Sequence, residues 1–215
     1  MKKEGFSKCK RLSVIFFLII LFSGSFHLTA QNKTLESVCK SLASHPNTSG
    51  DFTQIKTLQT NGRKLVSSGK FIFSQQGILW QTEKPFPSSL ILTKDAMVQI
   101  AANGKKSVMS GKDNQIFANI SETLSSVFSG NVEALKKNFE CQLIQESDAD
   151  WKIFLTPKDS TIASVMKSMV LAGVEADLSS LEMSEMSDNT IRYEFKNQKY
   201  PEELSADEKQ IFIVE

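Results

Sequence analysis

Hydrophobic residues repeat with two different periods after an apolar run near the start of the chain. Between Lys33 and Ser44 the period is helical, with Leu35, Val38, Cys39 and Leu42 on one face. His45-Pro46-Asn47 ends this predicted helix, because the residue before a proline avoids helical backbone angles. After Gly50 the period becomes two, which predicts strands.

Short strands with turn signals between them fill the stretch from Gly50 to Met109. Phe71 and Phe73 share one strand face, and Ile78 shares a face with Trp80. Asn61-Gly62 and Asn103-Gly104 are typical of hairpin turns. Further strands are predicted at Ser89 to Lys94, Met97 to Ala101 and Lys105 to Ser110. Such regular spacing predicts an antiparallel meander, curved or closed into a barrel.

The middle of the chain departs from this pattern with two predicted helices. The first begins near Ser121, ends at Gly130 and carries the apolar stripe Ile120, Leu124, Val127 and Phe128. The second runs from Asn131 to Asn138. These helices either bury an apolar sheet face permanently or form a movable lid over it, and the pattern fits both.

Strands resume afterwards. The predicted elements are strands at Phe139 to Glu146 and Trp151 to Thr156, a short helix at Ser160 to Met166, strands at Met169 to Ala176, Leu178 to Met186 and Thr190 to Asn197, and an edge strand at Gln210 to Val214. No linker or repeat divides residues 31–215, so the chain is expected to form one α+β, mainly β, domain.

The first thirty residues have the pattern of a secretory signal. A basic segment precedes the apolar run Leu12 to Phe22, and cleavage is expected near Ala30. An uncleaved anchor is the alternative, but the run is shorter than the roughly 20 apolar residues that span a bilayer. We therefore expect a soluble, exported protein comprising residues 31–215.

Loss of this leader changes the charge of the chain. The leader holds five of 25 basic residues and one of 24 acidic residues, so the remainder has a net charge of about −3. A mildly acidic chain without a basic stripe gives no electrostatic basis for binding nucleic acid.

Two cysteines remain after cleavage, Cys39 and Cys141. In an oxidising compartment they are expected to form a disulfide. The alternative is a pair of buried free thiols, since cysteine is also a common core residue.

Residues for catalysis or metal binding are scarce. His45 is the one histidine after the leader, and its place beside a proline predicts a solvent-exposed helix end. Asp148 and Asp150 are close in sequence but lie in a polar turn. We therefore expect no enzyme activity, no metal and no cofactor.

Several short motifs occur in an order that resembles a known family. They are Asp51-Phe52-Thr53-Gln54, Gly69, Gly77-Ile78-Leu79-Trp80 followed by Lys84-Pro85, Leu155-Thr156-Pro157, and Tyr193, Phe195 and Asn197. In this order the chain resembles the periplasmic outer-membrane lipoprotein carriers, the LolA-like family. The resemblance implies an incomplete antiparallel β-barrel, a curved sheet closed on one side by short helices, with an apolar interior for acyl chains.

The resemblance also implies partners. The family takes lipoproteins from an inner-membrane transporter, passes them to an outer-membrane acceptor and needs no cofactor. One departure concerns the Arg-Pro pair that the family carries before the tryptophan motif, where this chain has Gln75-Gln76. A neutral amide cannot replace the charged fork of arginine that helps to hold the helices closed. The cargo is therefore expected to be lipoprotein acyl chains or another exported lipid, carried by a monomer.

Residues expected to line the lipid cavity are Phe71, Phe73, Ile78, Trp80, Leu90, Leu92, Leu124, Val127 and Phe128. Pro85-Phe86-Pro87 is expected to form a stiff turn at the cavity rim. For each lining position the alternative is a packed core residue, since inward aromatic and aliphatic side chains usually form core. The alternative function is a protein-binding or envelope-sensing module on the same half-barrel.

Overall fold

A computed structural model describes residues 33–110, 122–123 and 125–213. The predicted leader, the start of the first middle helix and Leu124 lie outside the described residues. In the described part of the chain no helix is both long and apolar enough to cross a membrane.

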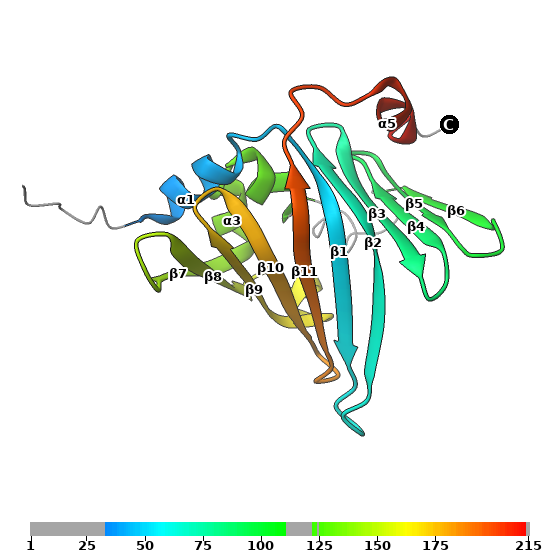
Figure 1. Cartoon of the computed structure of the whole chain (residues 1–215). Helices are drawn as coiled ribbons and strands as arrows, with labels where there is room; N and C mark the ends of the chain where they lie inside the picture. Colours follow the sequence, from blue (N-terminus) through cyan, green and yellow to red (C-terminus); the bar gives the residue numbers. More distant parts are fainter. Residues whose placement is uncertain (1–32, 111–121, 124, 214–215) are drawn as a thin grey trace, which may run out of the picture. The chain divides into compact units, whose positions relative to one another are not determined.

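Eleven strands of the described residues form one antiparallel sheet in the order β6-β5-β4-β3-β2-β1-β11-β10-β9-β8-β7 (Figure 1). Their bounds are β1 Asn47–Thr57, β2 Lys64–Ser74, β3 Gly77–Lys84, β4 Ser88–Leu92, β5 Ala96–Ile100, β6 Lys106–Ser110, β7 Phe139–Gln145, β8 Asp150–Pro157, β9 Met166–Val174, β10 Asp177–Glu185 and β11 Thr190–Lys199. The predicted mainly β fold with short helices is confirmed.

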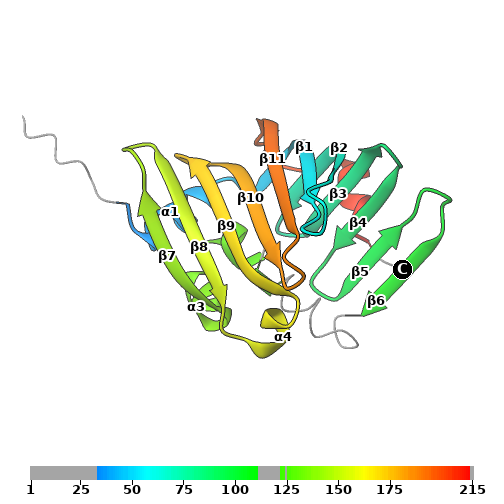
Figure 2. The ribbon, with the colours of Figure 1, turned by 90° about the horizontal axis from the view of Figure 1, so that it is seen from below.

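The sheet consists of two meanders that join where β1 pairs with β11, with Phe52 opposite Phe195. Figure 2 shows an open arch with β6 and β7 at its two ends and with helices α3 (Val132–Asn138) and α4 (Ser160–Ala163) on its inner side. Of the two expected outcomes, curved or closed, the curved and open sheet is the one that the structure has. Gly62 and Gly104, at the predicted hairpin turns, have φ of 67° and 77°, a region that glycine enters without strain.

Helices cover the inner face of the arch, called here the covered face. They are α1 Leu35–Leu42, the helical residues 122–123 and 125–129, α3 Val132–Asn138 and α4 Ser160–Ala163. Their apolar residues join the main core, among them Val38, Val127, Leu135 and Ile162. Thr34 and Ser37 form a reciprocal cap that starts α1.

The predicted edge strand at Gln210 to Val214 is wrong. Residues Ala206–Ile211 form helix α5, which begins with a capping box between Ser205 and Glu208. This cap and the run Ala-Asp-Glu-Lys-Gln favour a helix, and the apolar end then packs on the sheet. Phe212 joins a second cluster with Ile72, Leu79, Ile91 and Val98 on the opposite side, called here the outer face.

Candidate functional site

Aromatic side chains form the centre of the covered face. The rings of Phe73 and Phe128 stack with centroids 4.1 Å apart, and Phe73 meets Trp80 edge to face at 5.4 Å. Trp80 in turn lies 5.6 Å from Tyr193. One continuous apolar surface, called here the aromatic wall, is thus formed by strands β2, β3 and β11 and by the helical residues 125–129.

All eight described residues of the predicted cavity lie on this face. Phe71, Phe73, Ile78, Leu92 and Val127 are buried, whereas Trp80, Leu90 and Phe128 are partly buried. Phe71 and Val127, at 0% and 1% exposure, belong to packed core in this structure. The sequence pattern could not separate the two groups, and contact with lipid stays a prediction for each of them.

A cavity of about 320 Å³, called here the Trp80 cavity, lies beside this wall. Its lining residues are Phe52, Gln54, Trp80, Thr82, Ser88, Ser89, Leu90, Met97, Gln99 and Tyr193. Half of them are polar and none carries a formal charge. Sequence reasoning missed the polar members, although Thr82 and Ser88 share the strand faces of Trp80 and Leu90 at a spacing of two.

A larger cavity of about 540 Å³, called here the hairpin cavity, lies between the β2–β3 turn and the helical residues 125–129. Phe73, Ile78 and Phe128 line it, so three predicted residues border open space there. Gln75 and Gln76 form the turn and also line it. The place where the resembling family has arginine and proline therefore faces the covering helix with two neutral amides.

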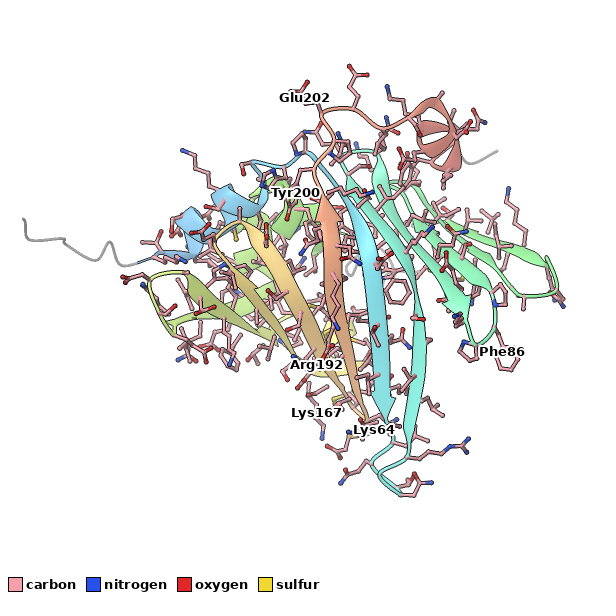
Figure 3. All side chains as sticks on the ribbon, viewed as in Figure 1. Lys64, Phe86, Lys167, Arg192, Tyr200 and Glu202 are labelled. Atoms are coloured by element: carbon pink, nitrogen blue, oxygen red, sulfur yellow. The ribbon has the colours of Figure 1, made fainter. Side chains whose placement is uncertain are left out.

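The turn Pro85-Phe86-Pro87 joins β3 to β4. The next two residues, Ser88 and Ser89, line the Trp80 cavity, which places the turn beside that cavity. The ring of Phe86 is 74% exposed and points to solvent (Figure 3). In the apolar stretch around Trp80, alternate strand residues therefore lie on the covered face, whereas Leu79 and Ile91 lie on the outer face, and the turn borders the Trp80 cavity.

One polar atom in this region lacks a partner. Nε1 of Trp80 is out of reach of solvent and makes no hydrogen bond, the one side-chain nitrogen or oxygen in that state among the described residues. An unsatisfied buried donor costs about 1–3 kcal/mol. By contrast, Nε1 of the core residue Trp151 donates to the carbonyl oxygen of Glu175 at 3.0 Å. The Trp80 site is therefore incomplete in a way that the Trp151 site is not.

Other candidate chemical groups are accounted for by local contacts. His45, expected to be solvent-exposed, is half-buried, because its ring stacks on Tyr200 with centroids 3.9 Å apart. Asp150 accepts a hydrogen bond from Ser147 at 2.6 Å within the β7–β8 turn. In the described ranges no three His, Cys, Asp or Glu side chains group so as to hold a metal ion.

The cysteines lie on facing elements, Cys39 on α1 and Cys141 on β7. Both thiols are free in the structure, so the predicted disulfide is not present in it. Burial raises the pKa of Cys39 to about 11, and the charge of an ionised Cys141 adds to this shift. Burial also raises the pKa of Cys141. The thiols are near enough to interact electrostatically, and their oxidation stays a prediction.

We expect the exported protein, purified without reductant, to contain the Cys39–Cys141 bond. Its intact mass should then be lower by two hydrogen atoms. Reduction should lower the free energy of unfolding by about 4.7 kcal/mol, because closure of a loop of about 100 residues restricts the unfolded chain. Mass spectrometry and urea unfolding with and without reductant check this.

The pH dependence gives an independent readout of the same bond. With the thiols reduced, the unfolded chain ionises near pH 9.0, whereas folded Cys39 ionises near pH 11. The raised folded pKa means that stability is constant below pH 9 and falls as pH rises from 9 to 11. A disulfide has no thiol to titrate, so the part of this decline between pH 9 and pH 10 should be absent before reduction. Above pH 10 the raised pKa values of Tyr193 and Tyr200 lower the stability of both forms. An unreduced protein whose stability falls between pH 9 and pH 10 as steeply as that of the reduced protein would contradict the bond.

The comparison with protein families identifies one family. The family model described as "Outer membrane lipoprotein carrier protein LolA" matches residues 44–211. No curated protein matches the chain. Among solved structures, a LolA superfamily protein of Nitrosomonas europaea is 8% identical, with 85% of this chain and 99% of that chain covered and a TM-score of 0.45. A DUF1329 family protein of Desulfovibrio piger is 10% identical, with coverage of 80% and 92% and a TM-score of 0.43.

Proposed function

Since the chain belongs to the outer membrane lipoprotein carrier family, LolA, whose model matches residues 44–211, we propose that it is a periplasmic lipid carrier. It binds lipoprotein acyl chains, or the chains of another exported lipid, on the covered face. It receives them at the inner membrane and releases them towards the outer membrane. A leader that is removed near Ala30 would direct the protein to this compartment.

The observation that carries this proposal is open space against an aromatic wall. The Trp80 cavity and the hairpin cavity, about 320 Å³ and 540 Å³, both border Trp80, Phe73 or Phe128. Both volumes fall in the range of about 300–1,000 Å³ that ligand pockets usually have. Acyl chains that enter either cavity would contact side chains that also pack against the main core, such as Trp80 and Phe128.

Energetics explain why a carrier needs such a wall. Burial of one methylene is worth about 0.8 kcal/mol, so transfer of a sixteen-carbon chain from a membrane into water costs roughly 12 kcal/mol of free energy. A carrier that returns most of this free energy makes the transfer possible. No covalent step is required, and the proposed role is binding and release without catalysis.

We include in this proposal a role for the helical residues 125–129. Val127 and Phe128 on this helix pack on the sheet, and the stacked pair Phe73 and Phe128 lies at the border of the hairpin cavity. Outward movement of the helix would join open space to the packed residues Phe71, Leu92 and Val127. In this way the predicted residues that are packed core in this structure would become lining residues when lipid is bound.

The second candidate is a protein-binding or envelope-sensing module. A third hollow of about 310 Å³ favours it, because it lies on the outer face and is lined by Leu79, Ile91, Val98, Ile100 and Ile211. Ile213 at its edge is 57% exposed. This hollow is on the other side of the sheet from the two cavities and would not be filled by the same cargo.

Mass spectrometry of the exported protein tests the carrier proposal. The protein is purified without detergent and measured under native conditions and again after organic extraction. We expect an additional mass that corresponds to an acylated molecule and that extraction removes. A protein that is bare, and that stays bare after incubation with membrane vesicles, would refute lipid carriage and leave the partner-binding candidate.

A further inference from the structure

We propose that the Trp80 cavity recognises the ester carbonyl groups of an acylated glycerol, with the indole N–H of Trp80 and the hydroxyl of Tyr193 as the hydrogen-bond donors. This inference rests on the proposed function and adds the chemical class of the cargo to it. Its basis is the buried N–H of Trp80, which has no acceptor, beside the hydroxyl of Tyr193 in a cavity whose lining residues carry no charge.

The first donor is the indole of Trp80. Its Nε1 is buried without a partner, although the ring lines a cavity that could hold an acceptor. A carbonyl oxygen is the acceptor that an indole N–H can use, since the indole nitrogen donates and does not accept. Trp151, the other tryptophan, has such a carbonyl from its own chain. At Trp80 the ligand would supply it.

The second donor is the hydroxyl of Tyr193, whose ring centroid lies 5.6 Å from that of Trp80. Tyr193 lines the Trp80 cavity, and a tyrosine hydroxyl is protonated at neutral pH and can donate a hydrogen bond. Burial raises the pKa of Tyr193 to about 12, which keeps this proton in place over a wider pH range. Two donors on neighbouring rings match the two ester groups of a diacylglyceryl unit.

The remaining lining residues restrict the charge of the ligand. Gln54, Thr82, Ser88, Ser89 and Gln99 are polar but neutral, and the rest of the lining is apolar. A phosphate or carboxylate placed there would lose water without gaining an opposite charge, which is strongly unfavourable. A neutral ester has no such penalty, and the amides and hydroxyls can bond its oxygens. The cavity therefore favours esters over free fatty acids and anionic headgroups.

The position of the cavity also orients the lipid. Phe52 lies on the border between the cavity and the main core, and Phe73, which belongs to that core, packs edge to face against the Trp80 ring. Ester groups held at Trp80 and Tyr193 would thus direct their acyl chains along the aromatic wall. Because Nε1 is covered in this structure, binding requires the ring or its neighbours to shift, and the adjoining cavity of about 320 Å³ gives room for this.

A pair of matched lipids tests the proposal. Dipalmitoylglycerol has two ester carbonyls, and dihexadecylglycerol has the same chain length with ether links and no carbonyl. We expect the wild-type protein to bind the ester about tenfold more tightly, a difference of about 1.4 kcal/mol for the hydrogen bonds. Palmitic acid should bind more weakly than methyl palmitate, a neutral ester with one chain of the same length, because its carboxylate finds no cation among the lining residues. Titration followed by native mass spectrometry gives the affinities.

Variants locate the preference. Trp80→Phe keeps an aromatic ring and removes the N–H, so it should weaken ester binding several-fold and leave ether binding unchanged. Tyr193→Phe should do the same to a smaller extent and keeps the test valid if Trp80→Phe folds poorly. Tyr200→Phe removes a hydroxyl outside the cavity and should change neither affinity.

Equal binding of ester and ether by the wild-type protein would overturn this inference while leaving lipid carriage intact. Equal losses for both lipids in Trp80→Phe would also overturn it, since they would show lost packing. Failure to bind either lipid or an S-diacylglyceryl-cysteine peptide would overturn the carrier proposal as well. An S-diacylglyceryl-cysteine peptide serves as a further arm: it carries the same esters, so tight binding supports the inference, and its affinity relative to dipalmitoylglycerol distinguishes lipoprotein from free glycerolipid.

Discussion

Replacement of Leu90 by aspartate should abolish lipid loading while the protein still folds. Leu90 is paired with Trp80 across β3 and β4 and is only partly buried where it lines the Trp80 cavity. A carboxylate at this position stays hydrated while no lipid is bound, but it loses its water when acyl chains fill the cavity. The unpaired buried charge costs several kcal/mol, so affinity should fall by more than about 100-fold.

Two controls separate this effect from unfolding. The asparagine of Leu90→Asn has nearly the same shape as aspartate but no charge, so this variant should lose clearly less affinity for lipid than Leu90→Asp. Val66→Asp introduces the same charge at a residue that is 55% exposed and lines neither cavity, so loading should be unchanged. Lipid occupancy by native mass spectrometry and circular dichroism of each variant give the comparison. A folded Leu90→Asp protein with normal occupancy would contradict the proposed cavity.

Leu90 is a better test position than Val127, which the sequence also indicates. Val127 is 1% exposed and packed in the main core. A charge there should unfold the protein whether or not it carries lipid, because burial of an unpaired charge is strongly unfavourable in either case. Only a half-buried lining residue lets the cavity be tested apart from the fold.

Replacement of Gly69 by alanine should destabilise the sheet by about 3 kcal/mol, or prevent folding. A Cβ at this position would lie 1.9 Å from the carbonyl oxygen of Gln81 and 2.8 Å from Cα of Thr82. These are backbone atoms of β3, so the strands themselves would have to separate. The β2–β3 register shifts between Ser68 and Gly69, and glycine permits the close approach there.

Gly104→Ala is the matched control for this prediction. Nothing lies within 4 Å of the added carbon, although the φ of 77° strains a residue with a side chain. The expected loss is about 1 kcal/mol, from backbone strain alone. Urea unfolding of the two variants and the wild-type protein measures the difference. Equal losses of unfolding free energy in the two variants would show that the close contact with β3 does not exclude a side chain at residue 69.

Local patterns predicted most of the fold because they act between residues close in sequence. Alternation placed Phe71 and Phe73 on one face of β2, and Asn61-Gly62 and Asn103-Gly104 lie in the turns that were predicted. The helical spacing of Leu35, Val38 and Leu42 predicted α1. The strand predicted at Gln210 to Val214 is wrong because the prediction used only the apolar residues of this segment. It did not use the capping box between Ser205 and Glu208, which starts helix α5.

The sequence by itself therefore determined the mainly β architecture, the covering helices and the set of apolar residues that face them, because periodicity and capping are local. Only the tertiary structure decided which of those residues are packed and which border open space, since that depends on how distant strands and helices meet. Trp80 and Trp151 look alike in the sequence, yet the chain supplies a carbonyl to one and leaves the other without a partner. Hydrogen-bond partners that lie far away along the chain cannot be read from periodicity.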